Sequence, residues 1–315
     1  MRVAIYGVGG AGGYFGARLA RAGADVVWVA RGAHLEALRR RGLEVESVHG
    51  DFSLGPLRAS ADPADLGQVD AVILGVKLWQ LLDAARAMFP LLGAGSCVLP
   101  LQNGVEAPDV LRSVLGDGPP LGGIAKIISE LVGPGHIRHH GGPSSLAFGE
   151  LDDRDSERVG RLRAAFRQAG VAVDVPKSIR SALWDKFLFV ASLGGVGAVC
   201  RAPLGVIRSV PETRALLEQA MIEIRALAHA RGVLLPDDVV EQALALADQQ
   251  PASGTTSLQR DLAAGRRSEL EWWSGSVVRL GLESGVPTPV HRFIYHSLLP
   301  SELRASGRLE YPAGS

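Results

Sequence analysis

Apolar residues in the first half of the chain gather in short runs of strand length, separated by segments with the composition of helices. The runs that fit strands are residues 2–6, 24–30, 70–76, 96–100 and 171–175. Continuous apolar runs of this length are typical of strands buried on both faces of a sheet. Residues 14–22 and 156–168 fit helices, and the glycine at position 23 supplies a common helix stop. This alternation predicts an α/β fold with a Rossmann-type, doubly wound parallel sheet.

Beyond residue 176 the pattern contains helices only. The segments that fit helices there are residues 179–198, 212–230 and 237–249. Ser209 and Glu212 have the Ser-x-x-Glu spacing of a capping box, and Gly232 closes the helix that they begin. The sequence therefore predicts a Rossmann-type domain over residues 1–176, followed by an all-α domain over residues 177–315. A substrate site is expected in a cleft between such domains.

A glycine-rich segment follows the first strand and opens the first helix: Gly7-Val8-Gly9-Gly10-Ala11-Gly12. In a GxGxxG of this kind the first glycine allows a tight turn, the second a close approach to a pyrophosphate, and the third close packing of helix on strand. The helix N-terminus offers N–H groups and the positive end of its dipole to the phosphates. Because the segment lies within a strand-helix-strand unit of about thirty residues, these residues are expected to bind a dinucleotide.

The residues after the second strand indicate which dinucleotide is bound. NAD-binding enzymes commonly place Asp or Glu there, to accept a hydrogen bond from the ribose 2′-hydroxyl. This chain has Arg31 at that point, and its first acid is Glu36. A guanidinium group binds phosphate oxygens with two parallel hydrogen bonds, whereas a carboxylate would repel them. The sequence therefore predicts NADP (NADPH) in preference to NAD, with Arg31 on the 2′-phosphate.

The 315-residue chain contains 47% apolar residues, enough for the cores of two ordinary domains. Its formal net charge is zero, so neither nucleic acid nor a membrane surface is expected as a partner. Cys97 and Cys200 lie in apolar segments without metal-ligand spacing, which predicts buried thiols in a reducing cytoplasm and no metal site. No signal peptide and no uncharged run of membrane-spanning length are expected. The apolar helix faces of the second domain suit either its own core or a homodimer.

Transfer of a hydride from a reduced nicotinamide to a carbonyl leaves an alkoxide, which requires a proton donor. Lys186 is the one cation beside an apolar run, residues 187–199, and burial of its ammonium group would lower its pKa toward the range of a general acid. A lysine that extends from a helix start to water is the plainer interpretation. Glu269 and Glu271 are carboxylates that could pair with Lys186, and their spacing leaves both open.

Several short segments along the chain form a recognisable set. They are the N-terminal GxGxxG, Gly75-Val76-Lys77, Gln102-Asn103-Gly104, Trp184-x-Lys186, Thr256-Ser257-Leu258 with Asp261, and Ser268-Glu269-Leu270-Glu271. With these segments in this order, the chain resembles the ketopantoate reductase (2-dehydropantoate 2-reductase) family over residues 1–299. The resemblance implies NADPH-dependent reduction of the keto group of 2-dehydropantoate to pantoate, a step of pantothenate and coenzyme A synthesis.

The resemblance also implies roles for individual residues. Lys186 would be the general acid, and Glu269 would orient it and bind substrate. Asn103 would lie near the nicotinamide and the substrate, Lys77 near the nicotinamide ribose, and Ser257 against the substrate carboxylate. Each has a plainer interpretation from sequence alone, because Asn103 could form a turn, Lys77 could be a solvated strand end and Ser257 could be a helix N-cap.

The chain departs from the family pattern on the helix that carries the lysine. Typical members present asparagines four and eight residues after it, about one and two turns along the same face. Here these positions are Val190 and Gly194. Glycines at 194, 195 and 197 are expected to leave space for a bulkier or less polar 2-oxo acid. Two alternatives to ketopantoate reduction therefore stay open: reduction of a different 2-oxo acid, and a non-catalytic NADPH-binding or sensing protein.

Overall fold

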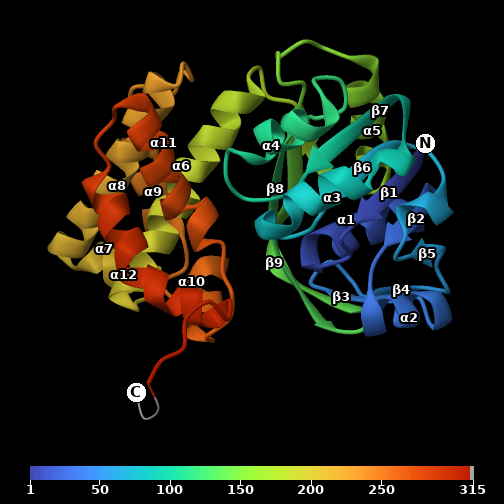
Figure 1. Ribbon diagram of the computed structural model, residues 1–315, viewed down its shortest axis with the longest axis horizontal. Helices are drawn as coiled ribbons and strands as arrows, with labels where there is room; N and C mark the ends of the chain where they lie inside the picture. The colour runs from blue at the N-terminus through green and yellow to red at the C-terminus, as the bar shows by residue number, and fades with distance from the viewer. Residues whose placement is uncertain (313–315) are drawn as a thin grey trace. The chain divides into compact units, whose positions relative to one another are not determined.

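The computed structural model describes residues 1–312 of the chain. Its internal contacts divide the chain into two compact units, one on each side of the bond between Arg180 and Ser181. Figure 1 shows that the strands belong to the blue-to-green part of the chain and that the yellow-to-red part is helical. The expected fold class, a Rossmann-type α/β domain followed by an all-α domain, is confirmed.

The parallel sheet of the N-terminal unit has the strand order β5-β2-β1-β6-β7. The strands are β1 Arg2–Tyr6, β2 Asp25–Val29, β5 Ala59–Ser60, β6 Val69–Leu74 and β7 Leu92–Pro100. Numbered along the chain within this sheet, the order is 3-2-1-4-5, which is that of a doubly wound dinucleotide-binding domain. In the central strand Ile5 pairs with Trp28 on one side and with Ile73 on the other. All three side chains are fully buried, which explains the continuous apolar runs.

Helices connect these strands and cover the sheet (Figure 1). They are α1 Gly10–Arg21, α2 Gly32–Arg40, α3 Leu81–Ala87, α4 Ala107–Leu115 and α5 Glu157–Gln168, with short 3-10 turns η1 Pro63–Leu66, η2 Leu78–Gln80 and η3 Phe89–Leu91. Helix α1 starts directly after β1 and contacts strands of both sheets of this unit, while α3 and α4 pack against each other. The predicted helix at 156–168 is α5, with the Ser156 hydroxyl accepting from the backbone N–H of Val159 as its N-cap.

A second sheet in the same unit was not anticipated from the hydrophobic pattern. Its strands are β3 Leu43–Ser47, β4 Phe52–Leu54, β8 Gly122–Gly133, β9 His136–Gly149 and β10 Ala172–Asp174. The order is β10-β9-β3-β4, and β8 pairs with β9 as a long antiparallel hairpin. Residues 171–175, predicted as the last strand of the doubly wound sheet, instead supply β10, which pairs in parallel with β9. That part of the sequence interpretation is wrong.

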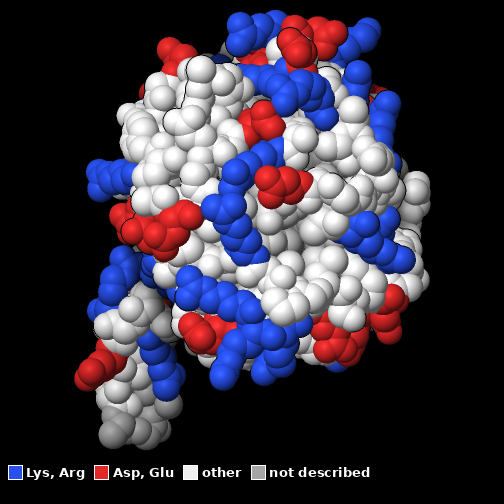
Figure 2. All heavy atoms as spheres, turned by 90° about the vertical axis from the view of Figure 1, so that its right-hand side faces the viewer, with Lys and Arg blue, Asp and Glu red and all other residues white. Residues whose placement is uncertain are grey.

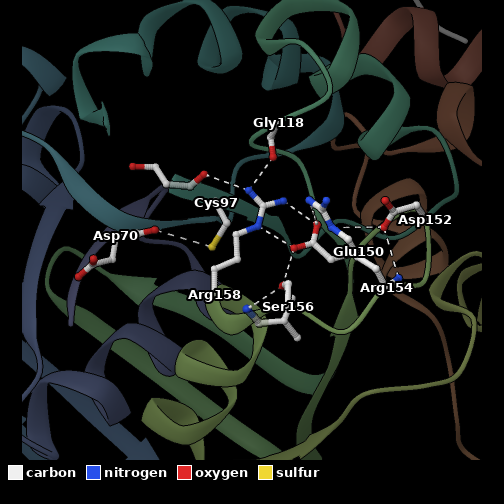
Figure 3. Close-up of polar contacts among 10 residues, drawn as sticks. Asp70, Cys97, Gly118, Glu150, Asp152, Arg154, Ser156 and Arg158 are labelled. Atoms are coloured by element: carbon white, nitrogen blue, oxygen red, sulfur yellow. Dashed lines mark hydrogen bonds and ion pairs between the residues drawn. The ribbon is translucent and has the colours of Figure 1, made fainter. Parts of the chain in front are cut away.

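A buried ion pair joins three segments of the N-terminal unit (Figure 3). Arg158 donates from Nε and Nη2 to the two carboxylate oxygens of Glu150, at 2.7 and 2.6 Å, and from Nη1 to the carbonyl oxygen of Gly118 at 2.6 Å. Ser156 Oγ donates to the same carboxylate at 2.6 Å. Burial alone would raise the pKa of Glu150, but the hydrogen bonds from Arg158 and Ser156 outweigh it and hold the pKa below its usual range. The pair ties α5 to the end of β9 and to the segment before β8.

The two cysteines have different surroundings. Cys97 on β7 is fully buried, and burial raises the pKa of its thiol to about 12, so it stays protonated. Cys200 is only partly buried, so the prediction of two buried thiols is correct for Cys97 alone. Both thiols are free.

The C-terminal unit is built of helices. They are α6 Ile179–Cys200, whose first two residues belong to the other unit, α7 Leu204–Ser209, α8 Pro211–Ala230, α9 Val239–Gln249, α10 Ser257–Ala263, α11 Ser274–Ser284 and α12 Pro289–Ala305, with a 3-10 turn η4 Leu270–Trp272. The capping box predicted at Ser209 and Glu212 is wrong. Ser209 is the last residue of α7 and its hydroxyl donates to the Val206 carbonyl at 3.0 Å, so Val210 is the N-cap of α8.

Helix α6 is long and apolar enough to cross a membrane by length and composition, with a mean hydropathy of 1.4 over an 18-residue window. Core helices of folded domains pass the same test. In this protein 61% of that window is buried inside the structure, as in a core helix. On the face of the molecule drawn in Figure 2, basic and acidic side chains are interspersed, as the zero net charge of the chain would suggest.

A buried histidine in the helical unit makes stability depend on pH. His291 is fully buried, and its Nε2 lies 3.1 Å from the Ala220 carbonyl. Burial lowers the pKa of His291 from 6.5 to about 4. A depressed histidine pKa means that the unfolded chain takes up a proton first, so stability is lost as pH falls from 6.5 to about 4. The neighbouring Glu223, whose pKa burial raises, offsets part of the loss.

We expect His291 to account for about 3 kcal/mol of this loss, from its shift to a pKa of about 4. Urea unfolding of the wild type and of His291→Gln at pH 7 and pH 4.5 measures it. The glutamine variant keeps a hydrogen-bonding side chain but does not titrate, so its stability should change less between the two pH values. Equal acid sensitivity in the two proteins would contradict the assignment.

Candidate active site

The glycine-rich turn after β1 has little room for side chains at its first and last glycines. Gly7 has φ +92°, and a Cβ atom there would lie 2.7 Å from the backbone nitrogen of Val76. A Cβ atom on Gly12 would lie 2.4 Å from the carbonyl oxygen of Gly7. At Gly9 the nearest atom would be 3.9 Å away, so the backbone is open there. A pyrophosphate-binding turn requires a tight turn at its first glycine, open space at its second and close helix–strand packing at its third, and Gly7, Gly9 and Gly12 meet these requirements.

The N-terminus of α1 is available to an anion. Gly9 is its N-cap in an extended conformation, and no side chain within residues 1–312 caps it. The predicted residues Val8, Gly10 and Ala11 belong to the same turn, with Val8 buried at 4% exposure. The residues present therefore fit a dinucleotide, since a twelve-residue helix directs its first N–H groups toward the open side of Gly9.

Arg31 lies at the N-cap of α2, directly after β2, with an exposed side chain. Burial raises the pKa of the Tyr6 hydroxyl at the end of β1, and the Arg31 guanidinium beside it opposes that rise. Arg31 is therefore positioned at the carboxyl ends of two adjacent parallel strands, where the ribose end of a dinucleotide is expected. The acid Glu36 lies on α2 and is exposed.

Two further loops at the carboxyl ends of the strands are held together by an amide side chain. Gln102, after β7, donates from Nε2 to the carbonyl oxygens of Leu74 and Val76 at 2.9 and 2.8 Å. This places the loop of Asn103 beside the loop of Lys77. Lys77 is exposed, with Nζ 5.7 Å from the centroid of the Trp79 ring, and Asn103 is partly buried. Gln102 belongs to the Gln102-Asn103-Gly104 motif, and its place in the sequence alone does not indicate this role.

In the helical unit the proposed proton donor is partly buried. Lys186 on α6 lies between the exposed Asp185 and the core residues Phe187 and Leu188. Both interpretations of Lys186, a general acid in an apolar setting and a side chain that reaches water, stay predictions. Val190 follows one turn later, also partly buried, and Gly194 two turns later, buried.

The space beside Gly194 is filled by protein. A Cβ atom on Gly194 would lie 2.6 Å from Cζ3 of Trp273 and 3.1 Å from Oγ1 of Thr256. Gly195 is covered in the same way by Ile294, and Gly197 by Gln259. The expectation that these three glycines leave room for a bulkier substrate is therefore wrong. The contact of Gly194 with Trp273 and Thr256 also shows that α6, the start of α10 and the segment after Glu269 pack together.

The two acids that the sequence left open differ in burial and in hydrogen bonding. Glu269 is buried, with 8% of its surface exposed, whereas Glu271 is exposed and accepts a hydrogen bond from Tyr295. The backbone N–H groups of Trp272 and Trp273 both donate to the Glu269 carbonyl at 3.0 Å, which fixes the turn that follows it. Burial and the Glu271 carboxylate raise the pKa of Tyr295 to about 12, so Tyr295 stays protonated.

Ser257 is the first residue of α10, and it is not the N-cap. Thr256 is the N-cap, and its hydroxyl accepts from the Gln259 N–H at 3.3 Å while the Gln259 side chain accepts from the Thr256 N–H at 2.9 Å. The N-cap interpretation of Ser257 is therefore wrong. Ser257 is partly buried and takes no part in the capping box of Thr256 and Gln259. It directly follows Thr256, the residue that contacts Gly194.

Two models of known families match the chain. One, described as "Ketopantoate reductase PanE/ApbA", matches residues 3–153, and its companion, "Ketopantoate reductase PanE/ApbA C terminal", matches residues 178–301. The chain belongs to the ketopantoate reductase family. Members of this family are NADP-dependent oxidoreductases, so the protein is an oxidoreductase with a Rossmann-type cofactor domain and NADP as its cofactor.

Individual relatives of the family cover nearly the whole chain. A 2-dehydropantoate 2-reductase of Mesorhizobium japonicum is 32% identical over 310 residues, which cover 92% of this chain and 94% of that protein. The crystal structure of a PanE/ApbA family ketopantoate reductase from Ralstonia eutropha JMP134 superposes with a TM-score of 0.88 at 35% identity, covering 97% of this chain and all of the other. A D-mandelate dehydrogenase at 20% identity and a TM-score of 0.85 shares the fold.

Proposed function

We propose that the protein reduces the keto group of 2-dehydropantoate to pantoate with NADPH, as a cytoplasmic step of pantothenate and coenzyme A synthesis. The observation that carries the proposal is the packing at Gly194, where helix α6 meets Thr256 at the start of α10 and Trp273 in the segment after Glu269. These three elements carry Lys186, Ser257 and Glu269. These are the three positions that the family resemblance gives to proton transfer and substrate binding. Relatives named 2-dehydropantoate 2-reductase support the same activity.

The N-terminal domain, residues 1–176, would hold the cofactor. The glycine-rich turn and the N-terminus of α1 suit the pyrophosphate, and the exposed guanidinium of Arg31 suits the 2′-phosphate. Lys77 and Asn103, held near each other by Gln102, would lie near the nicotinamide and its ribose. The bound nicotinamide supplies the hydride for the reaction.

The helical domain, residues 177–315, would supply the proton and bind the substrate. The Lys186 ammonium group donates a proton to the carbonyl oxygen as negative charge develops there, which avoids a free alkoxide. The buried Glu269 carboxylate orients the ammonium group and accepts a hydrogen bond from substrate. Ser257 donates its hydroxyl hydrogen to the substrate carboxylate.

A different 2-oxo acid is the second candidate substrate, and one feature of α6 favours it. Beyond Lys186 the same helix face carries Val190 and then Gly194, which is covered by the Trp273 ring. Neither position offers a hydrogen-bonding side chain. A polar substrate group beside Val190 would lose hydrogen bonds to water without replacement, at a cost of about 1–3 kcal/mol. The space beside Gly194 is already filled by the Trp273 ring. This face therefore suits an apolar substrate side chain.

The test is NADPH oxidation by the purified protein with a matched pair of substrates, 2-dehydropantoate and 3,3-dimethyl-2-oxobutanoate, which differ by one hydroxyl group. We expect kcat/KM on the order of 10⁴ M⁻¹s⁻¹ or above with 2-dehydropantoate, and lower activity with NADH because Arg31 has no 2′-phosphate to bind. Preference for the hydroxyl-free acid would establish the second candidate. Tight NADPH binding without turnover of any 2-oxo acid would indicate a non-catalytic binding protein.

A further inference from the structure

A buried carboxylate outside the proposed catalytic groups holds the segment that carries Glu269. Glu302 on α12 is 4% exposed, and its Oε2 accepts from the backbone N–H of Ser268 at 2.9 Å and from the Ser268 hydroxyl at 2.6 Å. Ser268 is itself buried, with 2% exposure. The two residues are 34 positions apart in the chain, so this contact exists only in the folded domain.

The backbone on both sides of Glu269 is fixed by hydrogen bonds. Before it, Ser268 is bonded to Glu302, and the Ser268 hydroxyl also accepts from the Leu270 N–H at 3.3 Å. After it, the N–H of Trp273 donates to the Glu269 carbonyl at 3.0 Å. The direction in which the Glu269 side chain leaves the backbone therefore depends on the Ser268 to Glu302 contact.

Holding this turn does not by itself require a carboxylate. Moving a charged oxygen out of water is costly, and well-packed apolar side chains stabilise a core at least as well. A carboxylate oxygen accepts hydrogen bonds that are shorter and about twice as strong as those to a neutral acceptor, which gives a defined position to the group it holds. Small errors in the position of a group beside the reacting atoms lower the rate steeply, by about 10²-fold for 1 Å.

We propose that Glu302 is a positioning residue for the reaction, which sets the Glu269 carboxylate through Ser268. The inference rests on the proposed function, because it assigns Glu302 to the same proton-transfer and substrate-binding site. Glu302 holds Ser268, the residue before Glu269, so it would act on the reaction by positioning Glu269.

The experiment compares Glu302→Gln with Glu223→Gln. Glu223 is a matched control, since it is a buried carboxylate of the same domain that accepts two hydrogen bonds, from the N–H groups of Val290 and His291 at 2.7 and 3.0 Å. We expect Glu302→Gln to lower kcat by about 10-fold or more, with a smaller change in KM and an altered pH profile of kcat. Glu223→Gln should leave kcat within about twofold, the usual scatter for a group away from the reaction.

A double-mutant cycle separates positioning from general structural damage. In the Glu269→Gln background, Glu302→Gln should cause no further fall in kcat, because the group that it positions is already gone. An additional fall, or equal losses of kcat in the Glu302 and Glu223 variants, would overturn the proposal. Should Glu302→Gln not fold, Ser268→Ala decides. It removes the 2.6 Å hydrogen bond to Glu302 and the 3.3 Å hydrogen bond from the Leu270 N–H, and keeps the backbone hydrogen bond of residue 268 to Glu302. It should lower kcat in the wild type but not in Glu269→Gln. Full activity of Glu269→Gln itself would instead refute the role of Glu269 in the proposed function.

Discussion

Lys186→Ala is expected to lower kcat by about 10²- to 10⁴-fold, the usual contribution of a positioned proton donor. The affinity for NADPH should stay unchanged, because the cofactor would be bound by residues of the other domain. Steady-state NADPH oxidation gives kcat, and quenching of protein fluorescence on NADPH titration gives the Kd. Lys186→Arg should not restore the rate, since a guanidinium group keeps its proton at any working pH and has a different shape.

The control for Lys186 is Lys177→Ala, nine residues earlier in the chain, where the side chain is exposed. That variant should retain the wild-type kcat. If Lys186→Ala also stays within about twofold of the wild type, then Lys186 has no part in proton transfer. Loss of NADPH binding together with activity would point to a folding defect, which the Tm of the variant would reveal.

Arg158→Ala is expected to destabilise the protein by about 3 kcal/mol, because the buried Glu150 carboxylate loses its two short hydrogen bonds and keeps only the exposed Arg154, at 4.0 Å, as a counter-ion. Glu150 is 3% exposed and Arg158 is 18% exposed, so little water can replace the lost partner. The substitution also removes the hydrogen bond that holds the Gly118 carbonyl. Urea unfolding followed by circular dichroism would measure the change in the free energy of unfolding.

The matched control is Arg214→Ala. Arg214 also forms a pair of parallel hydrogen bonds with a carboxylate, Asp248, at 2.7 and 2.8 Å, but the Arg214 and Asp248 side chains are 35% and 46% exposed. Its loss should cost about 0–1 kcal/mol. Equal losses of unfolding free energy in Arg158→Ala and Arg214→Ala would mean that burial does not determine how much these two ion pairs stabilise the protein.

The parts of the fold that sequence predicted are those with local signals. A continuous apolar run predicts the strand at residues 2–6. The turn after it needs a positive φ at position 7, which glycine adopts most readily, and the next helix begins directly after this turn. The hairpin of β8 and β9 has no such signal. Its strands combine glycines, histidines and half-exposed positions, and its register shifts several times, so the alternation expected of a strand is interrupted.

The same distinction applies to the candidate site. The glycine turn and Arg31 can be predicted from sequence because their positions depend on residues next to them in the chain. The difference in burial between Glu269 and Glu271 depends on distant segments, and Glu302 lies 34 residues from the serine that it holds. The partial exposure of Lys186 likewise depends on packing, which an apolar run in the sequence does not specify.

The contact between Gly194 and Trp273 constrains how this protein can evolve. A side chain added at 194 alone meets the ring at 2.6 Å, and a small residue at 273 alone leaves a cavity that costs about 3–5 kcal/mol. Each single step toward a polar side chain at position 194 thus passes through a less stable protein. The two positions are epistatic, and mutational drift would keep the apolar face even where selection for a polar substrate acts on the rest of the site.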